Sequence, residues 1–145
     1  MATMAQATTP PLLPGEIPAR IAARVIDTLI LTAIGVAFGQ VIGFKYDWLV
    51  MTASFVLAYF VLADVLAGAT PGKVVMRLRV IGGQGEKPSV KQAFQREWFM
   101  LLGAVPFAGP FLALAAWVWI VVAMRSSPMR QGVHDRWAGT RVVQR

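Results

Sequence analysis

The sequence predicts an all-α integral membrane protein: four short membrane helices in two hairpins, with a small cytoplasmic two-stranded β element. Three observations lead to this fold class. The 145 residues are 57% hydrophobic and only 14% charged, whereas a soluble domain is about one quarter charged. Several weakly charged stretches approach the roughly 20 residues that a helix needs to cross a bilayer. The net charge of +7 lies mostly in the segments between these stretches, as membrane insertion favours.

The N-terminal residues 1–19 are predicted to be a disordered tail, and residues 20–145 a single transmembrane domain. The tail contains four prolines and one acid but no base. It therefore lacks the basic start and apolar core of a secretory signal. We expect a proline-rich tail here and not a removed leader peptide.

The first span is expected at about residues 22–44, where Asp27 is the only charge from residue 25 onward. Glycines recur every four residues at Gly35, Gly39 and Gly43, which lets another backbone approach one face of the helix closely. We expect this face to pack against the second span. A dimer seam is the alternative, because such stripes serve both purposes.

The second span is expected at about residues 48–67, after a link whose Tyr46 and Trp48 suit the headgroup boundary. Residues 68–97 then carry six bases against two acids, which predicts a cytoplasmic loop. Within this loop, residues 74–81 end in a β-branched run followed by glycines, a pattern typical of a strand entering a turn. Residues 140–143 form a similar run, so we expect the two strands to pair on one side of the membrane.

Residues 98–124 are 27 uncharged residues interrupted by Gly103, Pro106, Gly109 and Pro110. One straight helix would be about 40 Å long. The loop before the stretch and the tail after it are both basic, which predicts an even number of crossings. We therefore expect an amphipathic start near Ser89, spans at about 92–105 and 110–124, and a turn between them. A single kinked span with the tail outside is the alternative.

Charged residues near the span ends are the candidate functional residues. Arg20, Arg24 and Asp27 share one helix face because they are four and three residues apart. Asp27 lies inside the hydrocarbon, where a carboxylate needs a partner. Two alternatives remain: Asp27 titrates and binds a proton or cation, or Arg24 holds it in a structural ion pair. We expect Asp64 and Arg96, with Glu97, at a similar depth, so these groups can gather at one boundary.

No catalytic, cofactor or metal site is predicted. The segment from Gly68 to Lys73 has too few residues between its glycines for a phosphate loop, and Val74 replaces the magnesium-binding hydroxyl. There is no cysteine and only one histidine, which excludes the usual zinc ligand sets. For His134 and Asp135 the sequence shows no nucleophile and no oxyanion site that would complete a hydrolase triad. We expect Asp135 to cap a short helix, with its charge facing the surrounding arginines.

Four motifs together resemble the RDD family of small bacterial membrane proteins, named for one arginine and two aspartates. Arg20-Ile-Ala-Ala-Arg-Val-Ile-Asp27 opens the first span, Thr70-Pro-Gly-Lys73 precedes Leu78-Arg-Val-Ile81, Gln95-Arg-Glu97 opens the third, and Gln131-Gly-Val-His-Asp-Arg-Trp-Ala-Gly-Thr140 precedes the last strand. The resemblance covers residues 17–143. It implies that Arg20, Asp27 and Asp135 match the naming residues, with Asp64 as the alternative second aspartate.

The resemblance implies a multipass protein loosely linked to the transport of unidentified ligands. We expect it in the cytoplasmic (inner) membrane with both termini cytoplasmic, because the basic segments lie on that side. Expected partners are anionic lipid headgroups and either further copies of the chain or the other subunits of a membrane complex. Nucleic acid is not expected, since insertion topology alone explains the basic charge. The alternative to transport is a non-catalytic accessory or scaffold subunit.

Overall fold

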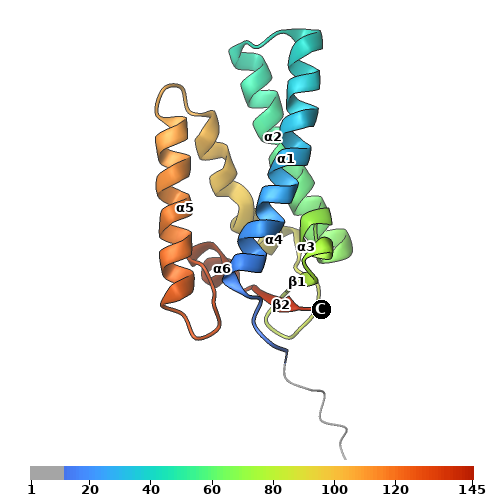
Figure 1. The fold of residues 1–145 in the computed structure, drawn as a ribbon, viewed down its shortest axis with the longest axis vertical. Coiled ribbons are helices and arrows are strands. Elements are labelled where there is room, and N and C mark those ends of the chain that lie inside the picture. Colours follow the sequence, from blue (N-terminus) through green and yellow to red (C-terminus); the bar gives the residue numbers. More distant parts are fainter. Residues whose placement is uncertain (1–11) are drawn as a thin grey trace, which may run out of the picture.

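The computed structural model describes residues 12–145 and is mostly helical, with one two-stranded sheet. The elements follow one another as α1 (Ile17–Ile42), α2 (Tyr46–Ala67), α3 (Pro71–Val75), β1 (Leu78–Ile81), α4 (Val90–Glu97), the 3₁₀ helix η1 (Trp98–Ala104), α5 (Gly109–Arg125), α6 (Val133–Ala138) and β2 (Arg141–Gln144). Two helical hairpins rise from a common base that holds the sheet and the short helices (Figure 1). The predicted helical fold with a two-stranded element is confirmed.

The first hairpin consists of α1 and α2, whose ends are set by proline and glycine. Pro18 stands in the first turn of α1, where its missing N–H costs no helical hydrogen bond. Gly43 follows α1 with φ 85°, and Gly68 caps α2 in the left-handed conformation with φ 68°. Only glycine adopts such backbone angles at no steric cost.

Both helices are long and apolar enough to cross a membrane, and their side chains face outward. Only 22% of the most apolar window of α1 and 11% of that of α2 are buried inside the molecule. Leu29 and Val41 in α1 and Leu66 in α2 are among the exposed large side chains. A core helix of a soluble protein would bury most of this surface, because apolar area exposed to water is unfavourable. These faces indicate contact with lipid.

The glycine stripe of α1 lies against its own hairpin. A Cβ at Gly35 would lie 3.1 Å from the Thr52 methyl of α2, and the Trp48 indole N–H donates to the Gly35 carbonyl at 2.8 Å. Gly39 lies under the ring of Phe44. The expected packing against the second span is therefore present at Gly35, with Trp48 anchored at the hairpin tip.

The second hairpin consists of α4 and η1 on one arm and α5 on the other. Ser89 caps α4 by accepting from the Gln92 backbone N–H, while the Gln92 side chain accepts from the Ser89 N–H, a reciprocal capping box. The chain reverses at residues 105–108, which include Pro106. Residues 98–124 thus form the predicted hairpin and not one straight helix, although the ascending arm narrows to a 3₁₀ helix.

The sheet joins two segments that are far apart in sequence. β1 and β2 are antiparallel, with Arg79 opposite Val143 and Val80 opposite Val142. The predicted pairing is confirmed, but the prediction that the first strand starts at residue 74 is wrong. Residues 71–75 form α3 because Pro71 starts a helical turn and the Thr70 hydroxyl accepts from the Lys73 N–H, as an N-cap does.

The predicted tail also ends earlier than expected. Pro14 bridges to Val143, the Gly15 N–H donates to the Val142 carbonyl, and α1 already begins at Ile17. The boundary at residue 19 is therefore wrong within the described part, because proline is tolerated in a first helical turn. Residues 1–11 of the predicted tail lie outside the described residues.

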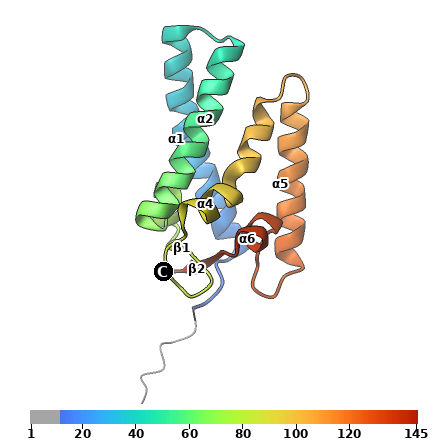
Figure 2. The same cartoon turned by 180° about the vertical axis from the view of Figure 1, so that it is seen from behind.

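The longer connecting segments lie at one end of the molecule. The links from α2 to α4 and from α5 to β2, and the described N-terminal residues, surround the base of both hairpins, while the two tight turns lie at the other end (Figures 1 and 2). A small core at the base packs Ala23 of α1 against Leu78, Val80 and Val142 of the sheet. This base positions the charged residues described next.

Candidate functional site

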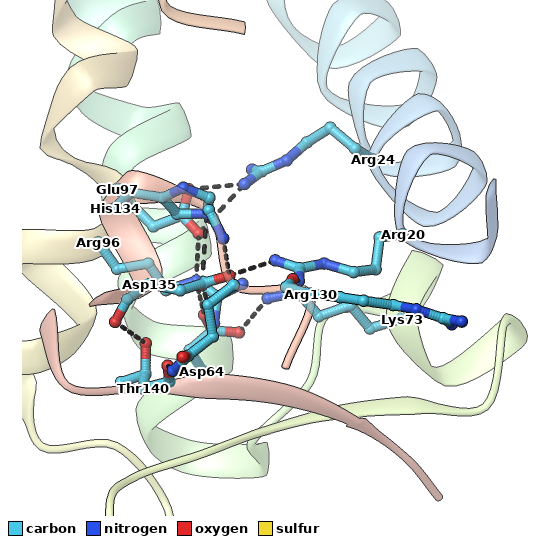
Figure 3. A network of polar contacts seen from close by, with 12 residues as sticks. Arg20, Arg24, Asp64, Lys73, Arg96, Glu97, Arg130, His134, Asp135 and Thr140 are labelled. Carbon is cyan, nitrogen blue, oxygen red and sulfur yellow. Dashed lines mark hydrogen bonds and ion pairs between the residues drawn. The ribbon is translucent and has the colours of Figure 1, made fainter. Parts of the chain in front are cut away.

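Seven charged side chains from five helices meet at the base of the two hairpins (Figure 3). We call them the charge cluster: the bases Arg20 and Arg24 of α1, Lys73 of α3 and Arg96 of α4, and the acids Asp64 of α2, Glu97 of α4 and Asp135 of α6. The three carboxylates are fully buried, and the bases are nearly so. A buried charge is stable only when it is paired and hydrogen-bonded.

Asp135 joins the C-terminal region to both hairpins. One carboxylate oxygen accepts from the Arg20 guanidinium and from the Gly132 backbone N–H, and the other lies 3.4 Å from Arg96 Nη1. The contact with Gly132 caps the start of α6 from its third residue, as a capping box does. The expected role of Asp135 in capping a short helix near arginines is therefore confirmed.

Arg24 reaches from α1 to the second hairpin. Its Nη2 donates to both carboxylate oxygens of Glu97, at 2.9 and 3.2 Å. The guanidinium carbon lies 4.0 Å from the ring centre of Phe60 and 5.3 Å from that of Trp117, which adds cation–π attraction. Arg24 therefore ties together α1, α2, α4 and α5.

Asp64 and Arg96 complete the cluster. The Lys73 ammonium donates to Asp64 at 2.5 Å. Arg96, only 2% exposed, lies 3.3 Å from Glu97, 3.4 Å from Asp135 and 3.8 Å from Asp64. It thus faces all three acids. At these distances the interaction is mainly Coulombic attraction, because well-formed hydrogen bonds are shorter.

Burial and neighbouring charges shift the pKa values at the base. Burial lowers the pKa of the His134 imidazole to about 4, although Asp135 opposes this shift. Burial alone would raise the pKa of Asp135, but His134, Arg96 and Arg20 outweigh it and hold that pKa well below the usual range. Burial also lowers the pKa of Lys73 against the opposing charge of Asp64. His134 is therefore neutral and Asp135 ionised at neutral pH.

Asp27 lies beside the charge cluster but has a different environment. Its carboxylate accepts from the Tyr59 hydroxyl at 3.1 Å, the Thr70 hydroxyl at 2.5 Å and the Gly72 backbone N–H at 2.8 Å. It forms no ion pair with any residue between 12 and 145. The hypothesis that Arg24 holds Asp27 is therefore wrong, because the long Arg24 side chain extends across to Glu97.

Glycine is required at position 72 for this environment. A Cβ there would collide with the Ala23 carbonyl oxygen and the Asp27 carboxyl group. The glycine lets the start of α3 approach α1 closely enough for its N–H to reach Asp27. The Thr70-Pro-Gly-Lys motif thus supplies a hydroxyl and an N–H to Asp27 and an ammonium to Asp64.

Asp27 balances the charge of the whole assembly. The cluster holds four bases and three acids, and the 1% exposed Asp27 is the fourth acid. With neutral His134, the buried charges sum to zero when Asp27 is ionised. A cavity of about 40 Å³ lies between Asp27 and the bases, which is enough for at least one water molecule.

Every candidate residue from the sequence lies in this assembly: Arg20, Arg24, Asp27, Asp64, Arg96 and Asp135. Sequence reasoning missed Lys73, Tyr59 and Thr70 as partners of the buried acids. Lys73 follows a glycine in a motif already singled out, so its position was a usable signal. Tyr59 lies mid-span and carries no comparable signal.

The family comparison supports the motif-based resemblance. A family model for the RDD family matches residues 14–139. The chain belongs to the RDD family. No curated protein and no solved structure gives a significant match. RDD membership, together with the two outward-facing apolar helices, indicates a membrane protein. Arg20, Asp27 and Asp135, which the resemblance led us to expect at the family's naming positions, lie in or directly beside the charge cluster, as does the alternative Asp64.

Proposed function

We propose that this RDD chain is a multipass protein of the bacterial cytoplasmic membrane that moves a small solute or ion, with Asp27 as its titratable group. One observation carries the proposal: Asp27 is a buried carboxylate whose hydrogen-bond donors are all neutral. Among the described residues no base forms an ion pair with Asp27, and uptake of a proton or an ion would change the net charge of the site. Ionisable groups inside membrane proteins commonly mark such pathways.

The charge distribution supports a cytoplasmic location for the end of the molecule that holds the sheet. Basic residues of the loops and the tail lie at this end, among them Arg79, Lys87, Arg125 and Arg141. At the opposite end, Lys45 is the only basic residue near the two turns of the described chain. Bacterial membrane proteins keep such basic segments in the cytoplasm. We propose that both ends of the described chain are cytoplasmic and that each hairpin crosses the membrane twice, with α5 near the lower length limit for a span.

Four short helices enclose little space, so the proposed transporter requires further copies of the chain. The charge cluster then has a separate role, namely to hold the two hairpins and the C-terminal region in one arrangement. Removing one partner of a buried pair costs about 3–5 kcal/mol. We propose no enzymatic role, and the cluster's charges are accounted for as mutual partners.

Flux in liposomes tests the proposal. Purified wild-type protein, Asp27→Asn and Asp47→Asn would be reconstituted at equal density and assayed for proton and small-ion flux across a pH gradient. Asp47 is an exposed acid in the first turn of α2 and provides the matched control. We expect flux from wild type and Asp47→Asn and at least a tenfold loss in Asp27→Asn. Equal flux from a correctly inserted Asp27→Asn protein would refute the role of Asp27.

The second candidate is an accessory or scaffold subunit, favoured by the balanced, closed charge cluster. Such a protein would dock a partner or anionic lipid on its basic face. Isolation from native membranes in mild detergent, followed by mass analysis, separates the two. A foreign protein at fixed stoichiometry favours the scaffold, and a pure homo-oligomer favours transport.

A further inference from the structure

The small cavity beside Asp27 has a distinctive wall. It lies where α1, α3, α4, α5 and α6 meet the sheet, and it measures about 40 Å³. Its charged or ionisable lining residues are Arg20, Arg24, Asp27, Lys73, Arg96 and His134. Apolar side chains, including Trp117, Ile120 and Met124, close the rest of the wall. The cavity is therefore a small space with a mostly apolar wall to which several charged groups contribute.

All four bases of the charge cluster line this cavity, whereas its three acids do not. Among the described residues, Asp64, Glu97 and Asp135 lie behind the bases, away from the cavity lining. Asp27 is the one carboxylate on the wall. The four bases thus bring nitrogen donors to a wall that is otherwise mostly apolar.

Some of these donors have no hydrogen-bond acceptor. The unbonded Nε and Nη1 of Arg96 lie 3.3 Å from Glu97 and 3.4 Å from Asp135, so they face the acids behind the bases and not the cavity. Nη1 of Arg24, by contrast, is buried without an acceptor in the described chain. A buried donor without an acceptor costs about 1–3 kcal/mol. An acceptor in the cavity would remove this cost.

We propose that the cavity binds a small monovalent anion, with chloride as the model ligand, and that Asp27 takes up a proton when the anion binds. This inference rests on the proposed function and names its substrate class. The volume of about 40 Å³ suits one single-atom ion or a few waters. Guanidinium and ammonium groups supply the donors that an anion needs.

Charge balance explains the coupling to a proton. The charge cluster and Asp27 together are neutral, so an added anion leaves one uncompensated negative charge in a low-dielectric site. Protonation of Asp27, the acid without a cationic partner, restores neutrality. The groups that face it around the cavity and its hydrogen bonds are Arg20 and Arg24 of α1, Tyr59 of α2, Lys73 of α3, Arg96 of α4 and His134 of α6.

Arg24 also lines a larger space next to the cavity. An apolar cleft of about 430 Å³ lies between α1, η1 and α5, and it shares Ile21, Arg24 and Trp117 with the cavity wall. A rotation of the Arg24 side chain away from Glu97 would connect the two volumes. We place the entry to the anion site at Arg24.

Thermal unfolding of the purified full chain in detergent tests the site. Sodium chloride would replace sodium gluconate at constant ionic strength, at pH 5.5 and at pH 8, and the line width of the chloride NMR signal would report binding directly. We expect chloride to raise the melting temperature saturably and to bind at least tenfold more tightly at the lower pH. A response to gluconate equal to that to chloride would overturn the proposal, as would a response that follows sodium against potassium.

Three variants sharpen the test. Asp27→Asn removes the charge that opposes the anion, so chloride should bind with the same affinity at both pH values. Arg24→Gln should weaken chloride binding at least tenfold. Arg125→Gln, an exposed base at the end of α5, should change neither. Wild-type affinity in Arg24→Gln would contradict the site, and the NMR measurement on wild type decides the question if a variant does not fold.

The outcomes also separate this inference from the proposed function. Chloride binding without any flux in liposomes would support the anion site and contradict the transport role. Flux that depends on Asp27 but proceeds unchanged in chloride-free gluconate would support the transport role and contradict the anion site.

Discussion

Asp135 and Asp27 are both fully buried acids at the same end of the molecule, but they are held in opposite ways. Asp135 faces Arg20, Arg96 and the imidazole of His134. Asp27 accepts only from two hydroxyls and one backbone N–H. Charged partners hold Asp135 in its ionised form, whereas the hydrogen-bond donors of Asp27 are all neutral. The difference separates an acid of the charge cluster from the acid proposed above to take up a proton.

The largest effect on stability is expected when the charge cluster loses an acid. Asp135→Ala leaves Arg20 and Arg96 buried with an uncompensated charge, which should lower the free energy of unfolding by about 3–5 kcal/mol. Chemical unfolding in mild detergent measures this change. A loss below about 1 kcal/mol would mean that water or a rearranged side chain replaces the carboxylate, and the contrast with Asp27 would fail.

Asp64 and Lys73 test whether the charge cluster is a matched set of charges. Each single change, Asp64→Leu or Lys73→Met, leaves the buried partner without its opposite charge and should lower the free energy of unfolding by about 3 kcal/mol. The double variant removes both charges and should be more stable than either single variant. Additive losses in the same unfolding assay would show that the two residues act independently.

The lowered pKa of His134 predicts that the stability of the protein depends on pH. The unfolded chain binds the imidazole proton below about pH 6.5, whereas the folded chain binds it only near pH 4. The unfolded state therefore holds more protons between these values, and stability should fall as pH drops through this window, by up to about 3 kcal/mol. Unfolding curves from pH 7 to pH 4 measure the loss, and His134→Gln should flatten the curve over that range. An unchanged slope in the variant would assign the dependence to another group.

The smallest effect is expected in the neutral environment of Asp27. Tyr59→Phe removes one of three donors and should cost about 0.5–1.5 kcal/mol, measured by the same unfolding assay. Leu29→Ala, a change on the exposed outer face of α1, serves as the packing control and should cost about 0.5 kcal/mol or less. A loss for Tyr59→Phe as large as that for Asp135→Ala would erase the distinction between the two regions.

Local patterns predicted most of the fold. Long apolar runs located α1 and α2, prolines located the second hairpin's turn, and matching β-branched runs located β1 and β2. Two short elements were not predicted from the sequence. The five residues of α3 are too few for a periodic pattern, and the 3₁₀ geometry of η1 has no distinct sequence signature.

The candidate residues were predictable, but their partners were not. Helical spacing groups Arg20, Arg24 and Asp27 on one face, and span ends suggest the depth of Asp64 and Arg96. Spacing within a helix carries no information about contacts such as Arg20 with Asp135 or Arg24 with Glu97, which are 115 and 73 positions apart. Of the two alternatives for Asp27, the ion pair with Arg24 was wrong for this reason, since it was inferred from closeness in sequence.

Infrared difference spectroscopy of the protein in lipid tests the contrast most directly. Acidification in the presence of chloride, in which Asp27 is proposed to take up a proton, should reveal a band of a protonated carboxylic acid that disappears in Asp27→Asn and persists in Asp47→Asn. A wild-type spectrum without such a band, or a band that survives in Asp27→Asn, would contradict Asp27 as the titrating group of this RDD protein.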